Sequence, residues 1–379
     1  MSKTLWMPSE ERIRDAQITR FMAYVDEHCG AGAGGDYFAL QAWAVANPEP
    51  FWSAVWDFCG VLAGSRGDAV LLDGDRFPGA RWFPEARLNF AENLLRSRDD
   101  TPALVSLLEN GERSELTHAG LYLQAAGLAA ALRAEGVVAG DRVAGFMPNI
   151  PETVIAMLAA ASIGAIWSSC SPDFGINGVM DRFGQIAPKV LFAADGYYYN
   201  GKTCDSRPRL AEVVNRIDSI RRVVVVPVVD AAPGLGDIRD SVLFGDYLDP
   251  AATEIDFARL PFDHPLYIMY SSGTTGVPKC IVHGAGGSLL QHLKEHQLLV
   301  DVRPGDRFFY FTTCGWMMWN WLVSGLASGA TLVLYDGSPF ARDGNLLLDA
   351  IDSEGINVFG TSAKFIAALE KAGHRPAQS

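Results

Sequence analysis

The segment YSSGTTGVPK, from Tyr270 to Lys279, follows an apolar run and combines small hydroxyl side chains with glycine and lysine. Glycine lets a backbone approach a ligand closely, and the neighbouring hydroxyl groups can donate hydrogen bonds. An ordinary surface loop between two strands is the alternative, but no acidic residue flanks the segment directly. We therefore expect a polyphosphate-binding loop, with these contact residues: Ser271, Ser272, Gly273, Thr274, Thr275, Gly276 and Lys279.

Two other glycine-containing segments also match nucleotide-binding patterns. GAGAGG at 30–35 fits G-x-G-x-x-G, but a helix rather than a strand precedes it, which favours a helix end followed by a loop. GYYYNGKT at 196–203 fits the P-loop pattern and follows a strand. Its three tyrosines are unlike the small residues that usually surround a phosphate. A P-loop NTPase that uses Lys202 stays open as an alternative function.

The segment HLKEH at 292–296 resembles an inverted zinc-protease signature. On a helix, His292 and His296 share one face. A surface-exposed amphipathic helix produces the same pattern, and no third ligand stands out downstream. We therefore interpret the segment as a surface helix, and we expect no metal ligand set in this chain.

Apolar strands alternate with helices through most of the chain. The strands are expected at 142–147, 165–170, 190–195, 222–229, 265–272, 308–313, 331–336 and 356–360. The helices are expected at 151–163, 178–186, 208–218, 286–299, 318–327, 344–353 and 362–373, with an earlier one that Thr117 caps. The strands are continuously apolar, as in parallel sheets with helices on both faces. This predicts an α/β fold of doubly wound, mostly parallel sheets packed with helices, with ligands at the carboxyl ends of the strands.

Three regions are expected along the sequence. Residues 1–95 form a helical, aromatic-rich leader, with helices near 9–28 and 39–60. Residues 96–264 form a first α/β subdomain. Residues 265–379 form a second, incomplete one that carries the phosphate-binding loop.

The amino-acid composition limits the partners and the cellular compartment that the chain can have. The 379 residues carry 31 Lys and Arg against 44 Asp and Glu, a net charge of −13. That charge argues against binding to nucleic acid or to an anionic membrane surface. No window approaches the roughly 20 apolar residues of a membrane span. The six scattered cysteines and the polar N-terminus, without a signal peptide, indicate the cytoplasm.

The 270–279 segment resembles the signature loop of the acyl-adenylating superfamily, which includes the acyl-CoA synthetases. In that superfamily the loop binds the β- and γ-phosphates of ATP while a substrate carboxylate attacks the α-phosphate. Coenzyme A then displaces AMP from the acyl-adenylate. The resemblance implies ATP and coenzyme A as substrates, and it makes Thr274 and Lys279 the candidate catalytic residues because they would stabilise charge on the leaving pyrophosphate.

Two longer segments, 82–95 and 279–340, resemble the acetoacetyl-CoA synthetases within this superfamily. The resemblance implies acetoacetate as the acid, with acetyl- or propionyl-CoA synthetase as the alternative. It also implies that Trp316, Met317 and Met318 contact the acyl group. The adaptable methionines suit an acyl group slightly larger than acetate.

The same relatives place coenzyme A contacts on a loop that matches 196–202 and near the position of Asn357. Lys202 would then meet a phosphate of coenzyme A. This sequence departs from the acetyl-CoA synthetases in that loop, since it has Tyr198 and Gly201 where they have arginines.

Three further parts of the superfamily do not occur in residues 1–379. They are a Tyr-Gly-x-Thr-Glu segment that binds Mg²⁺, an Asp that binds the ribose, and a mobile C-terminal domain with a catalytic Lys. The chain is thus expected to be the N-terminal large domain of such an enzyme, incomplete at its C-terminal end and inactive alone. The Mg²⁺ ligand is expected beyond residue 379. A shortened, non-catalytic nucleotide-binding module is the alternative.

Overall fold

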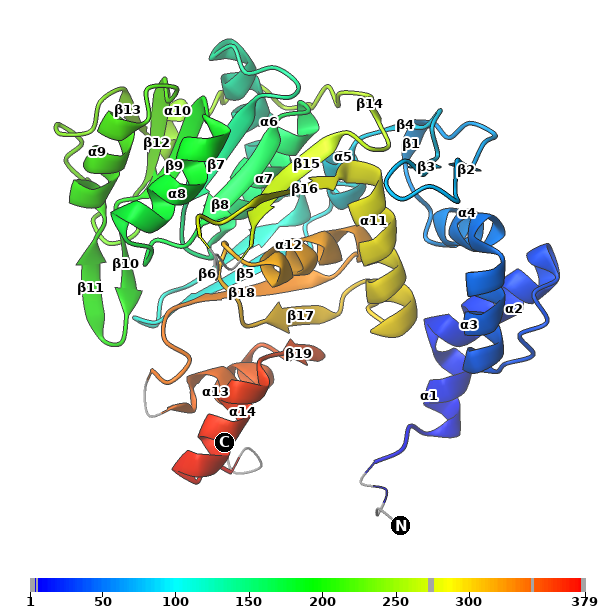
Figure 1. Cartoon of the computed structure of the whole chain (residues 1–379). Coiled ribbons are helices and arrows are strands. Elements are labelled where there is room, and N and C mark those ends of the chain that lie inside the picture. The colour runs from blue at the N-terminus through cyan, green and yellow to red at the C-terminus, as the bar shows by residue number, and fades with distance from the viewer. Residues whose placement is uncertain (1–3, 5, 272–275, 342–343, 376–379) are drawn as a thin grey trace.

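Two β-sheets form the framework of the computed structural model, which describes residues 4, 6–271, 276–341 and 344–375 (Figure 1). The larger sheet has seven strands, and only its last pair is antiparallel. Its strands lie in the order β13 (Ser241–Leu243), β12 (Arg222–Val226), β9 (Val190–Ala194), β7 (Arg142–Phe146), β8 (Ile166–Cys170), β15 (Pro265–Tyr270) and β16 (Cys280–Gly284).

The second sheet has five strands, and only its β5–β6 pair is antiparallel. Its strands lie in the order β19 (Val358–Gly360), β17 (Arg307–Tyr310), β18 (Thr331–Asp336), β5 (Pro102–Leu108) and β6 (Arg113–Thr117). Residues 102–117 thus join the sheet of the C-terminal region, whereas 265–284 join the earlier sheet. The sequence division at 264 therefore does not coincide with the division between the sheets.

Alternating burial explains why the strands are continuously apolar. In β9, Val190 and Phe192 pack into the cluster between the two sheets. Leu191 and Ala193 point the other way, into a cluster formed with α8 (Ile176–Ile186) and α9 (Arg207–Arg216). Because helices cover both faces, neither set of side chains meets water.

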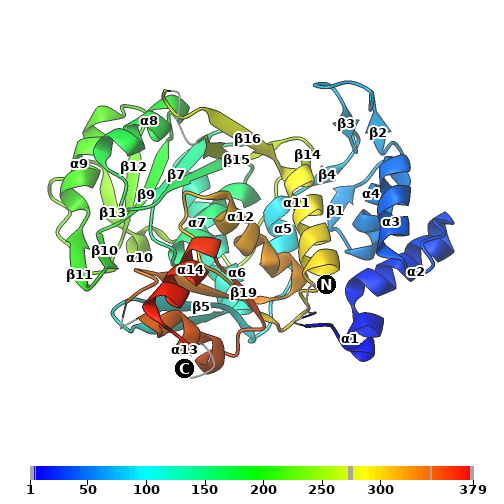
Figure 2. The same ribbon diagram turned by 60° about the horizontal axis from the view of Figure 1, so that its bottom comes forward.

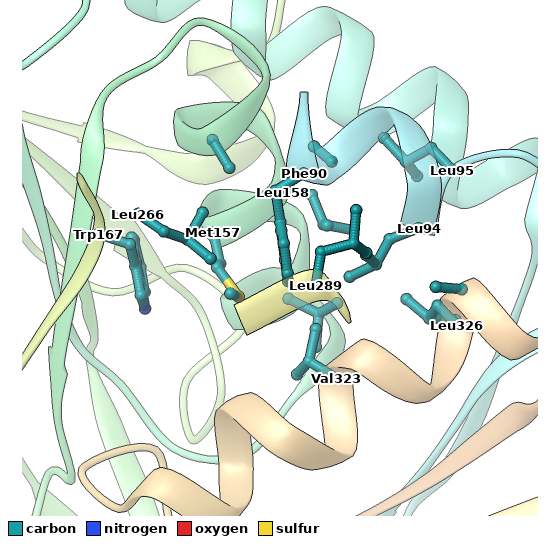
Figure 3. Packing of buried hydrophobic residues seen from close by; sticks show 14 of the residues in the cluster. Phe90, Leu94, Leu95, Met157, Leu158, Trp167, Leu266, Leu289, Val323 and Leu326 are labelled. Carbon is teal, nitrogen blue, oxygen red and sulfur yellow. The ribbon is translucent and has the colours of Figure 1, made fainter. Parts of the chain in front are cut away.

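A helical layer fills the space between the sheets (Figure 3). Its helices are α5 (Phe90–Leu94), α6 (His118–Ala134), α7 (Pro151–Ser162), α11 (Ala285–Leu293) and α12 (Met317–Val323), with a 3₁₀ turn at Ser324–Ser328. Leu158 of α7, Leu289 of α11 and Val323 of α12 belong to this one cluster. On the far side of the five-stranded sheet lie α13 (Leu346–Ser353) and α14 (Ala363–Ala372) (Figure 2). The sequence-based prediction of doubly wound, mostly parallel sheets is confirmed.

The N-terminal region is helical, but each of its two expected helices is broken. The helices are α1 (Glu10–Asp15), α2 (Gln17–Cys29), α3 (Tyr37–Ala46) and α4 (Pro48–Phe58). Ala16 has an extended backbone, and Asn47 precedes a proline, which disfavours helical geometry. Helix α2 ends at Gly30 in the left-handed conformation, so the 30–35 segment is a helix end and a loop, as predicted.

Short elements complete the chain. They are the small sheet of β1 (Ala63–Ser65), β4 (Arg87–Leu88) and β14 (Leu260–Pro261), the pair β2 (Leu71–Leu72) and β3 (Arg81–Trp82), the hairpin of β10 (Gly196–Tyr199) and β11 (Lys202–Asp205), the helix α10 (Phe244–Tyr247), and a π-helix at Lys294–Leu299. Within the described part of the chain, no helix has the length and apolar character needed to cross a membrane.

Candidate functional site

The topology of the seven-stranded sheet defines where a ligand is expected. Strand β7 lies between β8 and β9, and the chain runs from β7 to β8 before it crosses back to β9. Ligands of such sheets bind outside the carboxyl ends of the strands at this change of direction. The segment after β7, the end of β8 and the turn before α12 meet there, since Cys314 contacts both Pro148 and Ser169.

The proposed phosphate-binding loop joins β15 to β16. Its base is closed by two hydrogen bonds: Ser271 N–H donates to the Lys279 carbonyl at 3.0 Å, and Lys279 N–H donates to Ser271 Oγ at 2.9 Å. Gly276 has φ +141°, a conformation that other residues rarely adopt. The middle of the loop lies outside the described residues: Ser272, Gly273, Thr274 and Thr275. The Lys279 side chain is exposed at the base of the loop.

Helix α8 supports this loop from one side, which the sequence did not reveal. Gln185 Nε2 donates to the carbonyl of Pro278 at 2.8 Å. The guanidinium of Arg182 lies 4.7 Å from the ring centre of Phe174 and 5.5 Å from that of Tyr270. Neither residue belongs to a motif, so only the packing of α8 on the sheet could identify them.

The residues expected to contact the acyl group stand at the start of α12. Trp316 precedes the first turn of this helix and is 61% exposed, whereas Met317 and Met318 are half-buried. The turn before the helix rests on the carboxyl end of β8, because Ser169 Oγ donates to the Cys314 carbonyl at 2.7 Å. The structure thus places these three residues at the change of direction in the sheet.

The P-loop alternative for residues 196–203 is wrong. The segment forms the β10–β11 hairpin, and its turn residues Asn200 and Gly201 have φ +53° and +74°. An Asn-Gly pair with two positive φ values is typical of a two-residue hairpin turn, whereas a P-loop leads from a strand into a helix. The carboxylate of buried Glu109 accepts hydrogen bonds from the N–H groups of both turn residues.

The two residues expected to contact coenzyme A are not brought together. Lys202 is exposed at the tip of the hairpin, which lies away from β19 in both views (Figures 1 and 2). Asn357 precedes β19 at the amino end of that strand, and its Oδ1 accepts a hydrogen bond from Arg307 N–H at 2.8 Å. The side chain of Asn357 therefore already has a structural partner.

The interpretation of 292–296 as a surface helix is wrong, because both histidines are buried between the sheets. His292 Nδ1 lies 2.7 Å from Ser324 Oγ, and the His296 ring packs 4.5 Å from that of Trp321. Burial lowers the pKa of His292 to about 3 and that of His296 well below its ordinary value. Leu289, Leu290 and Leu293 are buried with them, so the histidines lie on the packed side of the helix, whereas Gln291 and Lys294 are only half-buried. Among the described residues, no group of three His, Cys, Asp or Glu side chains could hold a metal ion.

A half-buried carboxyl group also lies at the strand ends. Asp336 ends β18, and burial raises its pKa to about 6. Its Oδ1 accepts a hydrogen bond from the backbone N–H of Asn149 at 2.9 Å, which partly opposes that rise. This contact joins the end of the five-stranded sheet to the segment that follows β7.

Comparison with known proteins agrees with this architecture. Residues 90–379 match the family described as AMP-binding enzyme, and residues 37–94 match the one described as acetyl-coenzyme A synthetase N-terminus. The chain is 52% identical over its whole length to acetoacetyl-coenzyme A synthetase of Rhizobium meliloti and 46% identical to that of Danio rerio. It covers 58% and 57% of those proteins.

A solved structure is also similar to this chain along its whole length. The acetoacetyl-CoA synthetase from Streptomyces lividans superposes with a TM-score of 0.95 at 46% identity, over 100% of this chain and 58% of that one. The chain thus spans less than two thirds of the length of these relatives. The family match extends over most of its residues, and the chain belongs to the AMP-binding enzyme family.

Proposed function

We propose that this chain supplies the phosphate-binding loop and the acyl-group contacts of a cytoplasmic ligase that makes acetoacetyl-CoA from acetoacetate, ATP and coenzyme A. The observation that carries the proposal is the likeness to acetoacetyl-CoA synthetases along the whole chain, at 52% and 46% identity. The six cysteines of the described chain, all of them free, are consistent with a reducing compartment.

The first step is adenylation. A carboxylate oxygen of acetoacetate attacks the α-phosphorus of ATP, the bond to the bridging oxygen breaks, and pyrophosphate leaves. The 271–279 loop would bind the β- and γ-phosphates, where Thr274 and Lys279 stabilise the charge that develops on pyrophosphate. Trp316, Met317 and Met318 would surround the acyl group. In the second step, the thiol of coenzyme A attacks the acyl carbon, loses its proton and displaces AMP.

Mg²⁺ would enter as the complex with ATP. The described residues do not fit a protein site for it, because they contain no group of three metal-ligating side chains. Lys202 remains our proposal for a contact with a coenzyme A phosphate, since it is an exposed cation at a hairpin tip. Asn357 could contribute only by giving up its bond to Arg307 N–H.

The test is acetoacetate-dependent exchange of pyrophosphate with ATP. It compares the 379-residue chain with the same chain joined to the portion of the Streptomyces lividans enzyme that it does not match. We expect exchange in the joined protein and none above background in the chain alone. If the joined protein folds and shows no exchange while the Streptomyces enzyme does, the proposed function is wrong.

A further inference from the structure

Asn149 follows β7 at the change of direction in the seven-stranded sheet and is 1% exposed. Its carboxamide makes hydrogen bonds in two directions. Oδ1 accepts from Trp319 Nε1 at 2.9 Å, and Nδ2 donates to the carbonyl of Tyr335 at 3.3 Å. Trp319 belongs to α12 and Tyr335 to β18, so one buried side chain links the larger sheet, the five-stranded sheet and the helix that begins at Met317.

The residues next to Asn149 reinforce this link. Its own N–H donates to Asp336 Oδ1 at 2.9 Å. The carbonyl of Pro148 accepts from Cys314 Sγ at 3.2 Å and from Thr153 Oγ1 at 2.7 Å. The turn before α12 and the end of β18 are therefore both fixed to the segment that follows β7.

Helix α12 needs such support because it is short. It has 7 residues, and no side chain within the described parts of the chain caps its first turn. A helix of this length is not stable by itself, so tertiary contacts must set its position. A carboxamide suits this role because it donates and accepts at once, whereas a carboxylate only accepts and an apolar side chain does neither.

We propose that Asn149 is a positioning residue that sets the position of α12 relative to both sheets and thereby the affinity for the carboxylic acid substrate. This inference rests on the proposed function, because it assumes that Trp316, Met317 and Met318 contact the acyl group. Asn149 itself makes no substrate contact in this account. Its effect reaches the substrate through Trp319 and the first turn of α12.

Asn89 offers a matched control at the opposite end of α7. It is 0% exposed, and its Nδ2 donates to the carbonyls of Ala161, Ser162 and Ala258 at 2.9–3.2 Å. Helix α7 has 12 residues, which separates its two ends by roughly 18 Å. Asn89 thus matches Asn149 in burial and hydrogen bonding but lies away from the strand ends that face the substrate.

The experiment compares Asn149→Ala with Asn89→Ala in the joined protein. We expect Asn149→Ala to raise KM for acetoacetate roughly tenfold, the order of effect that loss of a buried hydrogen bond produces, and to change KM for ATP less than about twofold. Asn89→Ala should lower stability and leave both KM values unchanged. The proposal is overturned if Asn149→Ala leaves KM for acetoacetate unchanged. It is also overturned if Asn149→Ala and Asn89→Ala both raise KM for acetoacetate and KM for ATP to the same extent.

A second variant covers the case in which Asn149→Ala does not fold. Trp319→Phe removes the indole N–H but keeps most of the ring, and it should raise KM for acetoacetate selectively. The indole ¹H–¹⁵N resonance of Trp316 gives a readout that needs no activity: it should shift in Asn149→Ala and stay in place in Asn89→Ala. If the unmodified joined protein shows no exchange, the proposed function is wrong. The Trp316 indole resonance then tests the positioning role of Asn149 independently of activity.

Discussion

The loop at 270–279 and the turn at 314–318 both lie at the carboxyl ends of strands, but they are held in different ways. The loop closes on itself, through a bond between Ser271 and Lys279, 8 positions apart, and Gln185 of α8 adds a contact to Pro278. The turn and the helix α12 that follows it are held by residues 145 to 170 positions away, through Cys314 to Pro148 and Ser169 and through Trp319 to Asn149. The first region can be identified from a short string of residues, whereas the second depends on the fold.

The largest effect is expected in the loop, from Lys279→Ala. The lysine is exposed, so its removal should leave the free energy of unfolding within about 0.5 kcal/mol of the original value. Pyrophosphate exchange by the joined protein should fall about 100-fold to 1,000-fold, as for other donors that stabilise developing charge.

The control for this variant is Lys364→Ala, which removes an exposed lysine from α14. It should change neither exchange nor urea unfolding. If Lys279→Ala keeps full exchange activity, the loop does not act on phosphate in the way proposed.

A smaller effect is expected from Trp316→Ala in the turn. Because 61% of the side chain is exposed, its truncation should cost little stability. It should raise KM for acetoacetate roughly tenfold and leave KM for ATP unchanged. Asn149→Ala should give the same kinetic change with a loss of stability, so the pair separates contact with the substrate from positioning of the helix. Equal loss of stability in both variants would contradict this distinction.

The smallest effect concerns pH and the end of the same helical segment, where His292 contacts Ser324. Burial depresses the pKa of His292 in the folded chain to about 3, against an ordinary value of 6.5. Below pH 6.5 the unfolded chain therefore binds a proton that the folded chain does not, and stability falls as the pH falls from 6.5 towards 3. One such histidine contributes a slope of about 1.4 kcal/mol per pH unit.

This slope is measured by urea unfolding between pH 7 and pH 5. His292→Asn should show a weaker loss of stability with acid than the unmodified chain. The control is Asn89→Ala, which lowers stability without removing a titratable group and should keep the original pH dependence. Identical slopes in the unmodified chain and His292→Asn would show that the buried ring does not resist protonation.

The sequence predicted local structure well because helix and strand periods are local properties. The strand expected at 190–195 occurs at Val190–Ala194, and the helix expected at 151–163 occurs at Pro151–Ser162. The sequence did not predict that β5 pairs with β18, since strand order in a sheet depends on contacts far apart in the chain. For the same reason the 292–296 helix was assigned to the surface.

In the candidate site, too, the sequence did not reveal contacts between distant segments. The loop residues Ser271 and Lys279 could be named from their own segment, and Trp316 from a resemblance along the chain. Asn149 could not be named, because its importance lies in two partners, Trp319 and Tyr335, that the fold brings to it. A lone asparagine after an apolar strand carries no sequence signal of that role.

The most direct test of the proposed function is the acid preference of the joined protein. It compares kcat/KM for acetoacetate with that for acetate and propionate, at saturating ATP and coenzyme A. We predict a preference of at least about tenfold for acetoacetate, because it has two more heavy atoms than propionate and three more than acetate to fill a fitted pocket. An equal or higher kcat/KM for acetate or propionate would contradict it and would assign the chain to a synthetase of a shorter acid.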